Sequence, residues 1–265
     1  MATLRRIFVY PIKSLDPQPV DAATIVENGG FDGDREFALF DADGRYVNGK
    51  RNRDVHRLRS SVDRDEETVR LEPHGGDVRT FALDSDELTD WISSYFGEPV
   101  TLERERAGGF PDDTDASGPT VISTATIRAL ASWYPDIGAE SMRRRLRPNL
   151  EVDGVPAFWE DRLFSSRGET VEFAVGDGDD SVVFEGVNPC QRCVVPSRDP
   201  HTGEEYDGFR ERFVEKRRET MPEWSGGDWF DHHFRVMVNT RVDEADWGET
   251  LSVGDEVEIR GTKPV

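Results

Sequence analysis

The chain has 265 residues, enough for one or two domains with cores of their own. Its formal net charge is −21 and only 4 of its 33 basic residues are lysine, which excludes a nucleic-acid-binding protein, because such a surface repels phosphates. With 15 Phe and 6 Trp, it also differs from a disordered acidic chain, which is poor in aromatic residues. We expect a folded protein adapted to high salt, which screens the repulsion between its acids.

The sequence shows no signal-peptide pattern and no apolar run of about 20 residues, the length that would cross a membrane. Its 2 cysteines are typical of a reducing compartment. We therefore expect a cytoplasmic protein that does not contact membranes.

The first part of the chain is a series of short apolar or alternating runs separated by turns. A helix is expected after Asp84, which would form a capping box with Glu87, and Gly97 would end it. Residues 107–118, rich in Gly, Asp and Pro, indicate a long surface loop or a domain boundary. Strands are predicted over residues 3–11, 21–26, 36–40, 45–47, 58–63, 68–72, 78–83 and 99–105.

The second part begins with a predicted helix, for which Thr124 is the expected N-cap and Pro135 the end. Ser123 and Thr126 lie at its start, where free backbone N–H groups favour anions. Residues 143–147 then contain four arginines. They form either a solvated face paired with nearby acids or an anion site, since guanidinium groups match phosphate geometry.

Strands and turns continue to the end of the chain, with an acidic turn at residues 176–180 and a charged helix at 206–220. His232 and His233 fall inside a predicted strand, where adjacent side chains point to opposite faces and cannot easily share one metal. Many short strands separated by turns predict a mainly β, barrel-like fold with a few helices. The remaining strands are expected over residues 150–152, 169–175, 181–187, 230–238 and 250–259.

Both cysteines, Cys190 and Cys193, lie in residues 188–203, directly after a predicted strand. Asn-Pro, Asp-Pro and Thr-Gly steps indicate a tight loop there. Arg192 and Arg198 flank the thiols, and positive neighbours favour the thiolate. A thiolate is the form needed for a nucleophile or a soft metal ligand.

Several interpretations of the cysteine pair stay open at this point. A disulfide across two intervening residues would constrain little, and a zinc site would need two further ligands, of which His201 could be one. A thioredoxin-like motif opens a helix, which Pro196 and Pro200 oppose. An inert pair of small hydrophobic side chains is the remaining alternative.

Five short motifs are spread along the chain: YPIKS at 10–14, GDR at 33–35, RPN at 147–149, ED at 160–161, and CxxC at 190–193 with DPHTG at 199–203. They occur in the order known from the MOSC family, which is named after the C-terminal part of molybdenum cofactor sulfurase. The sequence resembles the two-part form of that family, as in the mitochondrial amidoxime-reducing component and its bacterial relatives. The resemblance covers nearly the whole chain and implies an N-terminal β-barrel-like domain, residues 1–118, packed on a MOSC β-barrel domain, residues 119–265.

The resemblance implies a molybdenum–pyranopterin cofactor, with Cys193 as the molybdenum ligand and Cys190 as its neighbour. Ser123 and Thr126 are weaker candidates for cofactor contact, and His233 falls near a tyrosine that amidoxime reducers use beside the cofactor. At family level the resemblance also brings an association with pyridoxal phosphate binding, to which no residue is assigned. The residues expected to contact the cofactor directly are Lys13, Ser14, Arg35, Arg147 and Asn149.

By resemblance, the reaction is reduction of a small N-hydroxylated or N-oxide substrate by oxygen-atom transfer. No cysteine follows Cys193, so we expect a separate electron donor of ferredoxin or cytochrome type with its reductase. We also expect the enzyme to be a monomer. Family members often carry Thr-Thr-Val where this chain has Pro-Ser-Arg at residues 196–198, which leaves substrate choice open. The alternatives are a non-catalytic module that carries the cofactor or sulfur, and a zinc or thiol-redox protein that uses both cysteines.

Overall fold

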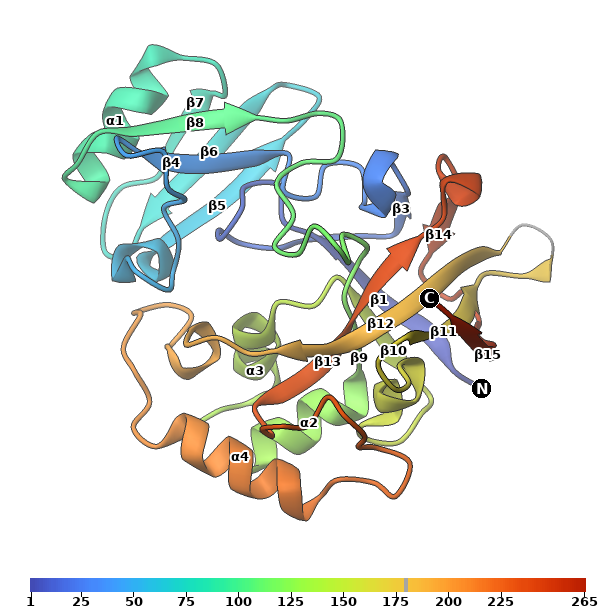
Figure 1. The fold of residues 1–265 in the computed structure, drawn as a ribbon. Helices are drawn as coiled ribbons and strands as arrows, with labels where there is room; N and C mark the ends of the chain where they lie inside the picture. The colour runs from blue at the N-terminus through green and yellow to red at the C-terminus, as the bar shows by residue number, and fades with distance from the viewer. Residues whose placement is uncertain (179–180) are drawn as a thin grey trace.

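The computed structural model describes residues 1–178 and 181–265, so the end of the acidic turn expected at residues 176–180 lies outside the described residues. The fold is mainly β, as predicted. Figure 1 shows two lobes, one with helix α1 and a set of short strands, the other with a long twisted sheet and the remaining α-helices at one end.

The large sheet contains strands from both ends of the chain, in the order β15-β11-β12-β13-β9-β10-β1-β2. All adjacent pairs are antiparallel except β9 and β10. Because β1 pairs with β10, the sheet crosses the domain boundary predicted at residue 118, which itself stays a prediction. The strands are β1 (Thr3–Val9), β2 (Gln18–Val20), β9 (Val121–Ser123), β10 (Leu150–Asp153), β11 (Glu169–Val175), β12 (Val182–Gln191), β13 (Arg235–Val242) and β15 (Val257–Pro264).

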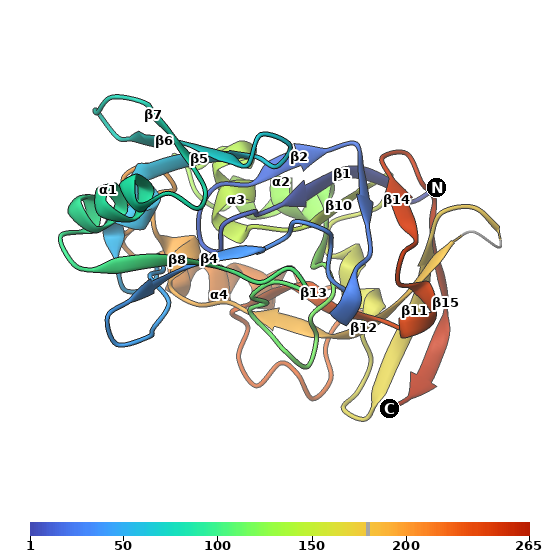
Figure 2. The same ribbon diagram turned by 90° about the horizontal axis from the view of Figure 1, so that it is seen from above.

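A second pairing also joins the two parts of the chain, between β3 (Ala22–Thr24) and β14 (Thr250–Ser252). Figure 1 labels both strands beside the large sheet, and Figure 2, seen from above, labels β14 at the side of the sheet near the N-terminus. The side chains beneath the sheet, among them Phe173 and Phe184, form one buried hydrophobic core. The N-terminal strands are therefore structurally part of the sheet on which the second half is built.

The other lobe contains the β-meander that the sequence predicts. Its core includes Leu58, Val69 and Phe81 from the three-stranded sheet and Leu88 from helix α1. The elements are β4 (Phe37–Asp41) paired with β8 (Val100–Arg104), β5 (Leu58–Asp63), β6 (Thr68–Pro73), β7 (Arg79–Ala82) and α1 (Asp86–Phe96).

Three α-helices of the second lobe share a further core, to which Ile127, Met142 and Phe213 contribute. The helices are α2 (Thr124–Ser132), α3 (Ala139–Leu146) and α4 (Phe209–Glu219). The 3-10 helices are η1 (Glu27–Gly29), η2 (Arg53–Arg57), η3 (Trp159–Leu163), η5 (Val195–Ser197) and η6 (Glu244–Asp246).

The structure corrects several details of the sequence prediction. The N-cap of α1 is Ser85, whose side chain accepts a hydrogen bond from the Leu88 backbone, so the capping box at Asp84 is wrong. The return strand expected at residues 45–47 is reduced to a single bridge, because β4 pairs with β8 instead. Among the described residues, no helix is long and apolar enough to cross a membrane.

The strand expected at residues 230–238 begins only at Arg235. His232 and His233 precede it in a turn, so the argument that they alternate along a strand is wrong. In contrast, β12 is longer than expected and carries Cys190 in the strand itself, with a bulge between Pro189 and Gln191.

Candidate functional site

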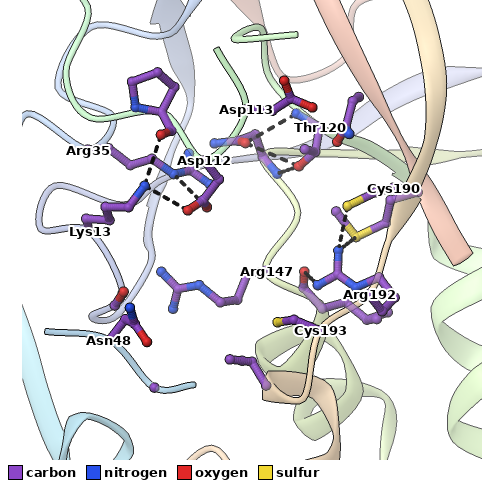
Figure 3. A pocket seen from close by; sticks show the side chains of 18 of the residues that line it. Lys13, Arg35, Asn48, Asp112, Asp113, Thr120, Arg147, Cys190, Arg192 and Cys193 are labelled. Carbon is purple, nitrogen blue, oxygen red and sulfur yellow. Dashed lines mark hydrogen bonds and ion pairs between the residues drawn. The ribbon is translucent and has the colours of Figure 1, made fainter. Parts of the chain in front are cut away.

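A cavity of about 750 Å³ lies where the two lobes meet. It is lined by the loop after β1, the turn before β4, the loop between β8 and β9, the C-terminal end of α3, and the ends of β12 and β13. Figure 3 shows this pocket with its labelled side chains, which come from both halves of the sequence. Six predicted site residues line it together with Cys190: Lys13, Ser14, Arg35, Arg147, Asn149 and Cys193.

The cavity lining is strongly basic, although the protein as a whole has a net charge of −21. Eleven lysine and arginine residues face four aspartates and no glutamate in this lining. Such local concentration of positive charge in a concave site focuses the field on an anion. The cavity is therefore suited to a negatively charged ligand.

Lys13 is 7% exposed, and its ammonium group is held by one short segment of the loop between β8 and β9. Nζ donates to the backbone oxygens of Phe110 at 2.8 Å and Pro111 at 3.0 Å, and lies 2.7 Å from Asp112 Oδ1 (Figure 3). It also lies 4.8 Å from the centre of the Tyr46 ring. Burial lowers the pKa of Lys13, while Asp112 acts in the opposite direction.

The GDR motif forms a turn that carries Arg35 to the cavity. Gly33 and Arg35 both have positive φ, 76° and 53°, and Asp34 accepts a hydrogen bond from the Tyr10 backbone at 2.7 Å. Asp34 also pairs with the Arg35 guanidinium, whose Nε lies 3.5 Å from Asp112. Burial opposes the charge on Arg35, but Asp34 and Asp112 raise its pKa above the ordinary value.

Arg147 is separate from the other arginines of its cluster. It is the left-handed C-cap of α3, with φ 58°, and its guanidinium lies 4.3 Å from the centre of the Tyr10 ring and donates to Leu15 O at 2.7 Å. Burial lowers its pKa, and no carboxylate of the described chain forms an ion pair with it. Arg147 is thus a charged group inside the cavity whose positive charge is not neutralised by a direct partner.

The other three arginines of this cluster bond to the protein itself, as the alternative of pairing with nearby acids predicts, but Arg145 is buried, so they do not form a solvated face. Arg143 pairs with the buried Glu151 at 2.6 Å, and Arg144 lies 3.7 Å from Asp16. Arg145 donates to Pro196 O at 3.1 Å. Only Arg147 fits the anion-site alternative without a competing carboxylate.

Asn149 lines the cavity and also joins two segments of the fold by hydrogen bonds. Its Nδ2 donates to Phe8 O at 3.1 Å, and its Oδ1 accepts hydrogen bonds of 3.2 Å from both the backbone and the hydroxyl of Thr120. These bonds join β1 to the segment before β9. Next to Lys13, Ser14 has a φ of 75° and turns the chain along the cavity wall.

Both cysteines are free thiols at the cavity wall. Arg192 Nη1 donates to Cys190 Sγ at 3.1 Å and lies 3.7 Å from Met237 Sδ, while Nη2 donates to Leu146 O at 2.9 Å. In Figure 3 the side chains of Cys193 and Arg147 point into the open part of the pocket, away from this sulfur–guanidinium group. Cys193 is the thiol that remains open to a ligand.

Arg198, the second positive neighbour expected for the thiols, lines the cavity, but the terminal nitrogens of its guanidinium bond to the protein itself. Its guanidinium donates to Gly203 O at 3.1 Å and lies 3.5 Å from Glu205. Both arginines line the cavity with the thiols, but only Arg192 is recorded in contact with a sulfur among the described residues.

Family models match the chain in two parts, the "MOSC N-terminal beta barrel domain" over residues 1–97 and the "MOSC domain" over residues 116–258. The chain belongs to the MOSC domain family. The family is related to molybdenum cofactor sulfurase and linked to the molybdenum cofactor. The two-part arrangement predicted from the sequence is confirmed.

Other comparisons add little to this assignment. No curated protein matches the chain. Among solved structures it is similar to the YUAD protein from Bacillus subtilis (APC1665), with 13% sequence identity, 98% of this chain and 96% of that chain covered, and a TM-score of 0.39. A likeness of that size supports no conclusion about function.

The donor set of this MOSC cavity fits an anionic cofactor that contains a soft metal. Within the described chain, the Nε atoms of Arg192, Arg198 and Arg235 are buried without a hydrogen-bond partner, and all three residues line the cavity. Buried donors of this kind normally have partners, so each is a position where a ligand or water can be accommodated. Cys193 supplies the thiolate-forming group that a soft metal prefers.

Ser123 and Thr126, also expected at the cofactor, do not line the MOSC cavity. Ser123 caps α2 by accepting a hydrogen bond from Thr126 N at 3.0 Å, and both residues are fully buried. Thr126 Oγ1 donates to Glu160 Oε2 at 2.9 Å. The Thr126 hydroxyl and the Ser123 backbone N–H therefore both donate to one oxygen of a buried carboxylate of the ED motif.

Glu160 is the centre of this second, closed cluster. Burial and the neighbouring Asp161 raise the pKa of Glu160 to about 7. Asp161 pairs with Arg217, which is fully buried and lies 4.3 Å from the Phe158 ring centre. The cluster holds η3 against α2 and α4 and does not contribute to the cavity wall.

His233 is likewise outside the cavity. It lies beside Phe230, with ring centres 5.9 Å apart, and burial lowers its pKa. Among the described residues, no group of three or more His, Cys, Asp or Glu side chains could hold a metal ion, so the zinc alternative gains no further ligand.

Sequence reasoning missed Asp112, which lines the cavity, and the part played by Tyr10, which lies behind two of the cavity arginines. Tyr10 belongs to the YPIKS motif, but its role is to lie between the guanidinium groups of Arg35 and Arg147. Asp112 is one of several acids in an irregular loop and carries no pattern of its own. Its contacts with Lys13 and Arg35 distinguish it from the other acids of that loop.

Proposed function

We propose that the protein is a molybdenum-cofactor-dependent oxidoreductase that removes the oxygen atom from N-hydroxylated or N-oxide-type substrates. One observation supports this above the others: the free thiol of Cys193 shares a single basic cavity with Lys13, Arg35 and Arg147. These residues are far apart in sequence, and the fold brings them together. The proposal also rests on the link between the MOSC family and the molybdenum cofactor.

The cavity residues divide into two roles. Cys193 would bind molybdenum through its sulfur, while Lys13, Arg35 and Arg147 would hold the phosphate end of the pterin. Tyr10 positions two of these guanidinium groups, and its own hydroxyl donates to Pro148 O at 2.9 Å. When bound, the cofactor supplies the two-electron, oxygen-accepting chemistry that these side chains cannot perform.

The overall reaction needs a reductant from outside the chain. An N-hydroxylated substrate, two electrons and two protons give the reduced nitrogen compound and water. The described residues contain no cluster of metal-ligating side chains that could act as an internal electron relay. We therefore propose a separate donor protein of ferredoxin or cytochrome type, and a small-molecule substrate that enters the same cavity.

A second candidate is a non-catalytic carrier of the cofactor. It is favoured by the way in which the protein's own loop satisfies Lys13, because a site that is satisfied without ligand can release its ligand readily. A carrier would contain bound pterin but would not turn over.

The two candidates are separated by turnover assays with a chemically or enzymatically reduced donor and hydroxylamine-type or N-oxide substrates. We expect turnover by the protein as expressed with cofactor supply, loss of turnover in Cys193→Ala, and retained turnover in the matched variant Cys190→Ala. Bound pterin without turnover would favour the carrier. Full activity in Cys193→Ala would contradict the proposal.

A further inference from the structure

The loop between β8 and β9 enters the cavity at residues 110–112, which we call the 110–112 segment. An ammonium group has three N–H donors. All three of Lys13 are directed to this segment, two to the backbone oxygens of Phe110 and Pro111 and one to the Asp112 carboxylate. In this state Lys13 has no donor left for a ligand.

The same segment also contacts Arg35. Asp112 Oδ2 lies 3.5 Å from Arg35 Nε, and Phe110 N donates to Arg35 O at 2.9 Å. The Asp112 carboxylate therefore lies between the two cations that an anionic ligand would use (Figure 3). Arg147, which forms no ion pair with any described residue, adds to the positive field at this carboxylate.

A second anion cannot be added to this arrangement without a change. A phosphate group and the Asp112 carboxylate would require the same N–H donors, and two anions at this distance repel each other strongly. One of them has to leave. The position of Asp112 is thus equivalent to that of a bound anion supplied by the protein itself.

The structure around the segment favours its displacement. It lies in an irregular stretch, and the side chain of Asp112 is 66% exposed although it points at the cations. Gly108 and Gly109, directly before it, have φ values of 114° and 66°, a region that only glycine adopts readily. Directly after it, Asp113 fixes a turn by accepting a hydrogen bond of 3.0 Å from Asp115 N.

We propose that the 110–112 segment is a displaceable latch: Asp112 occupies the anion position between Lys13 and Arg35 until the phosphate group of an incoming ligand displaces it. This proposal extends the proposed function and rests on it only for the identity of the incoming ligand. Because the latched state has to open first, the apparent affinity for phosphate is lower than that of the open site. Asp112 thereby sets how readily the cavity is loaded and emptied.

The test is a titration of the full-length protein with inorganic phosphate by isothermal titration calorimetry. Asp112→Asn keeps an oxygen that can accept a hydrogen bond from Lys13 but removes the competing charge, so we expect about tenfold tighter binding of phosphate. Asp113→Asn is the matched control. It removes the same charge from the same lining, and Asn also caps turns, so we expect less than about a twofold change.

Each outcome of this titration decides the proposal. Unchanged or weaker phosphate binding in Asp112→Asn would overturn it, as would an equal gain in Asp113→Asn, which would indicate a general charge effect. Lys13→Met should abolish the binding in either background, and binding that persists in Lys13→Met would show that the phosphate lies elsewhere. Thermal unfolding of each variant establishes that it is folded.

Hydrogen–deuterium exchange gives a second readout that charge alone would not change. We expect the backbone amides of residues 110–116 to exchange faster when phosphate is bound to the wild-type protein, because the segment leaves its contacts. Slower exchange on binding would overturn the latch. Neither measurement needs molybdenum, so a protein that passes both but takes up no molybdenum when expressed with a full supply of cofactor would contradict the proposed function and leave the latch intact.

Discussion

Two clusters of charged residues, one open and one closed, contain the motifs of this MOSC protein. The cavity cluster has cations in excess, and within the part of the chain that the structure describes Arg147 forms no ion pair. The closed cluster places Arg217 against Asp161, and Thr126 against Glu160, in fully packed surroundings. Both lie near helix ends, yet only the first adjoins a volume that a ligand can fill. The comparison teaches that the balance of charge, rather than the presence of a motif, distinguishes a binding site from a structural one.

The largest expected effect comes from breaking the closed cluster. Arg217→Met leaves the buried Asp161 without its partner and should lower the free energy of unfolding by about 3 to 5 kcal/mol. Arg147→Met is the matched substitution in the cavity. Because burial already disfavours the Arg147 charge, we expect a change within about 1 kcal/mol. Urea unfolding measures both, and equal losses would contradict the division into open and closed clusters.

The pH dependence of stability gives a second test of the closed cluster. The pKa of Glu160 is about 7 in the folded protein against an ordinary value of 4.5, so the folded state binds more protons between these values. Stability from this group is therefore present below about pH 4.5 and is lost as the pH rises through about 7.

Glu160→Gln, which resembles the protonated acid, should remove that loss and be more stable than wild type at pH 8 by about 3 kcal/mol. At pH 4.5 the two proteins should be nearly equal. Unfolding free energies at both pH values provide the check. Parallel pH profiles for the two proteins would show that Glu160 ionises normally.

Asn149 lines the cavity and also forms hydrogen bonds that hold the fold together, so it tests whether one residue can have both roles. Asn149→Ala removes its bonds to Phe8 and Thr120 and should cost about 1 to 3 kcal/mol of stability, by leaving buried polar groups unpaired. If Asn149 also contacts the cofactor, the folded variant should contain less molybdenum than the wild type. Wild-type molybdenum content in the folded variant would assign Asn149 a structural role alone.

Much of the fold follows from local patterns. Alternating apolar residues predicted β5, β6 and β11 because their neighbours in the sheets reinforce the same alternation. β2 was missed because Pro19 opposes a strand, but β2 is at the edge of its sheet, where the missing N–H is tolerated. α3 was missed because its arginines hide a short apolar stripe, Met142 and Leu146.

The site was only partly predictable. The motifs indicated Lys13, Arg35, Arg147 and Cys193, which the fold brings to one cavity. The positions of Ser123 and Thr126 could not be predicted from the sequence. An N-cap hydroxyl gives the same sequence pattern whether it faces a ligand or a buried carboxylate, and only the packing of Glu160 distinguishes the two.

The molybdenum and pterin content of the purified protein tests the central proposal most directly. Expressed with a full supply of cofactor, the wild-type protein and Cys190→Ser should each contain about one molybdenum and one pterin per chain, because a single thiolate ligand is used. Cys193→Ser should contain little molybdenum. A wild-type protein without molybdenum, or a Cys193→Ser variant that retains it fully, would contradict the account.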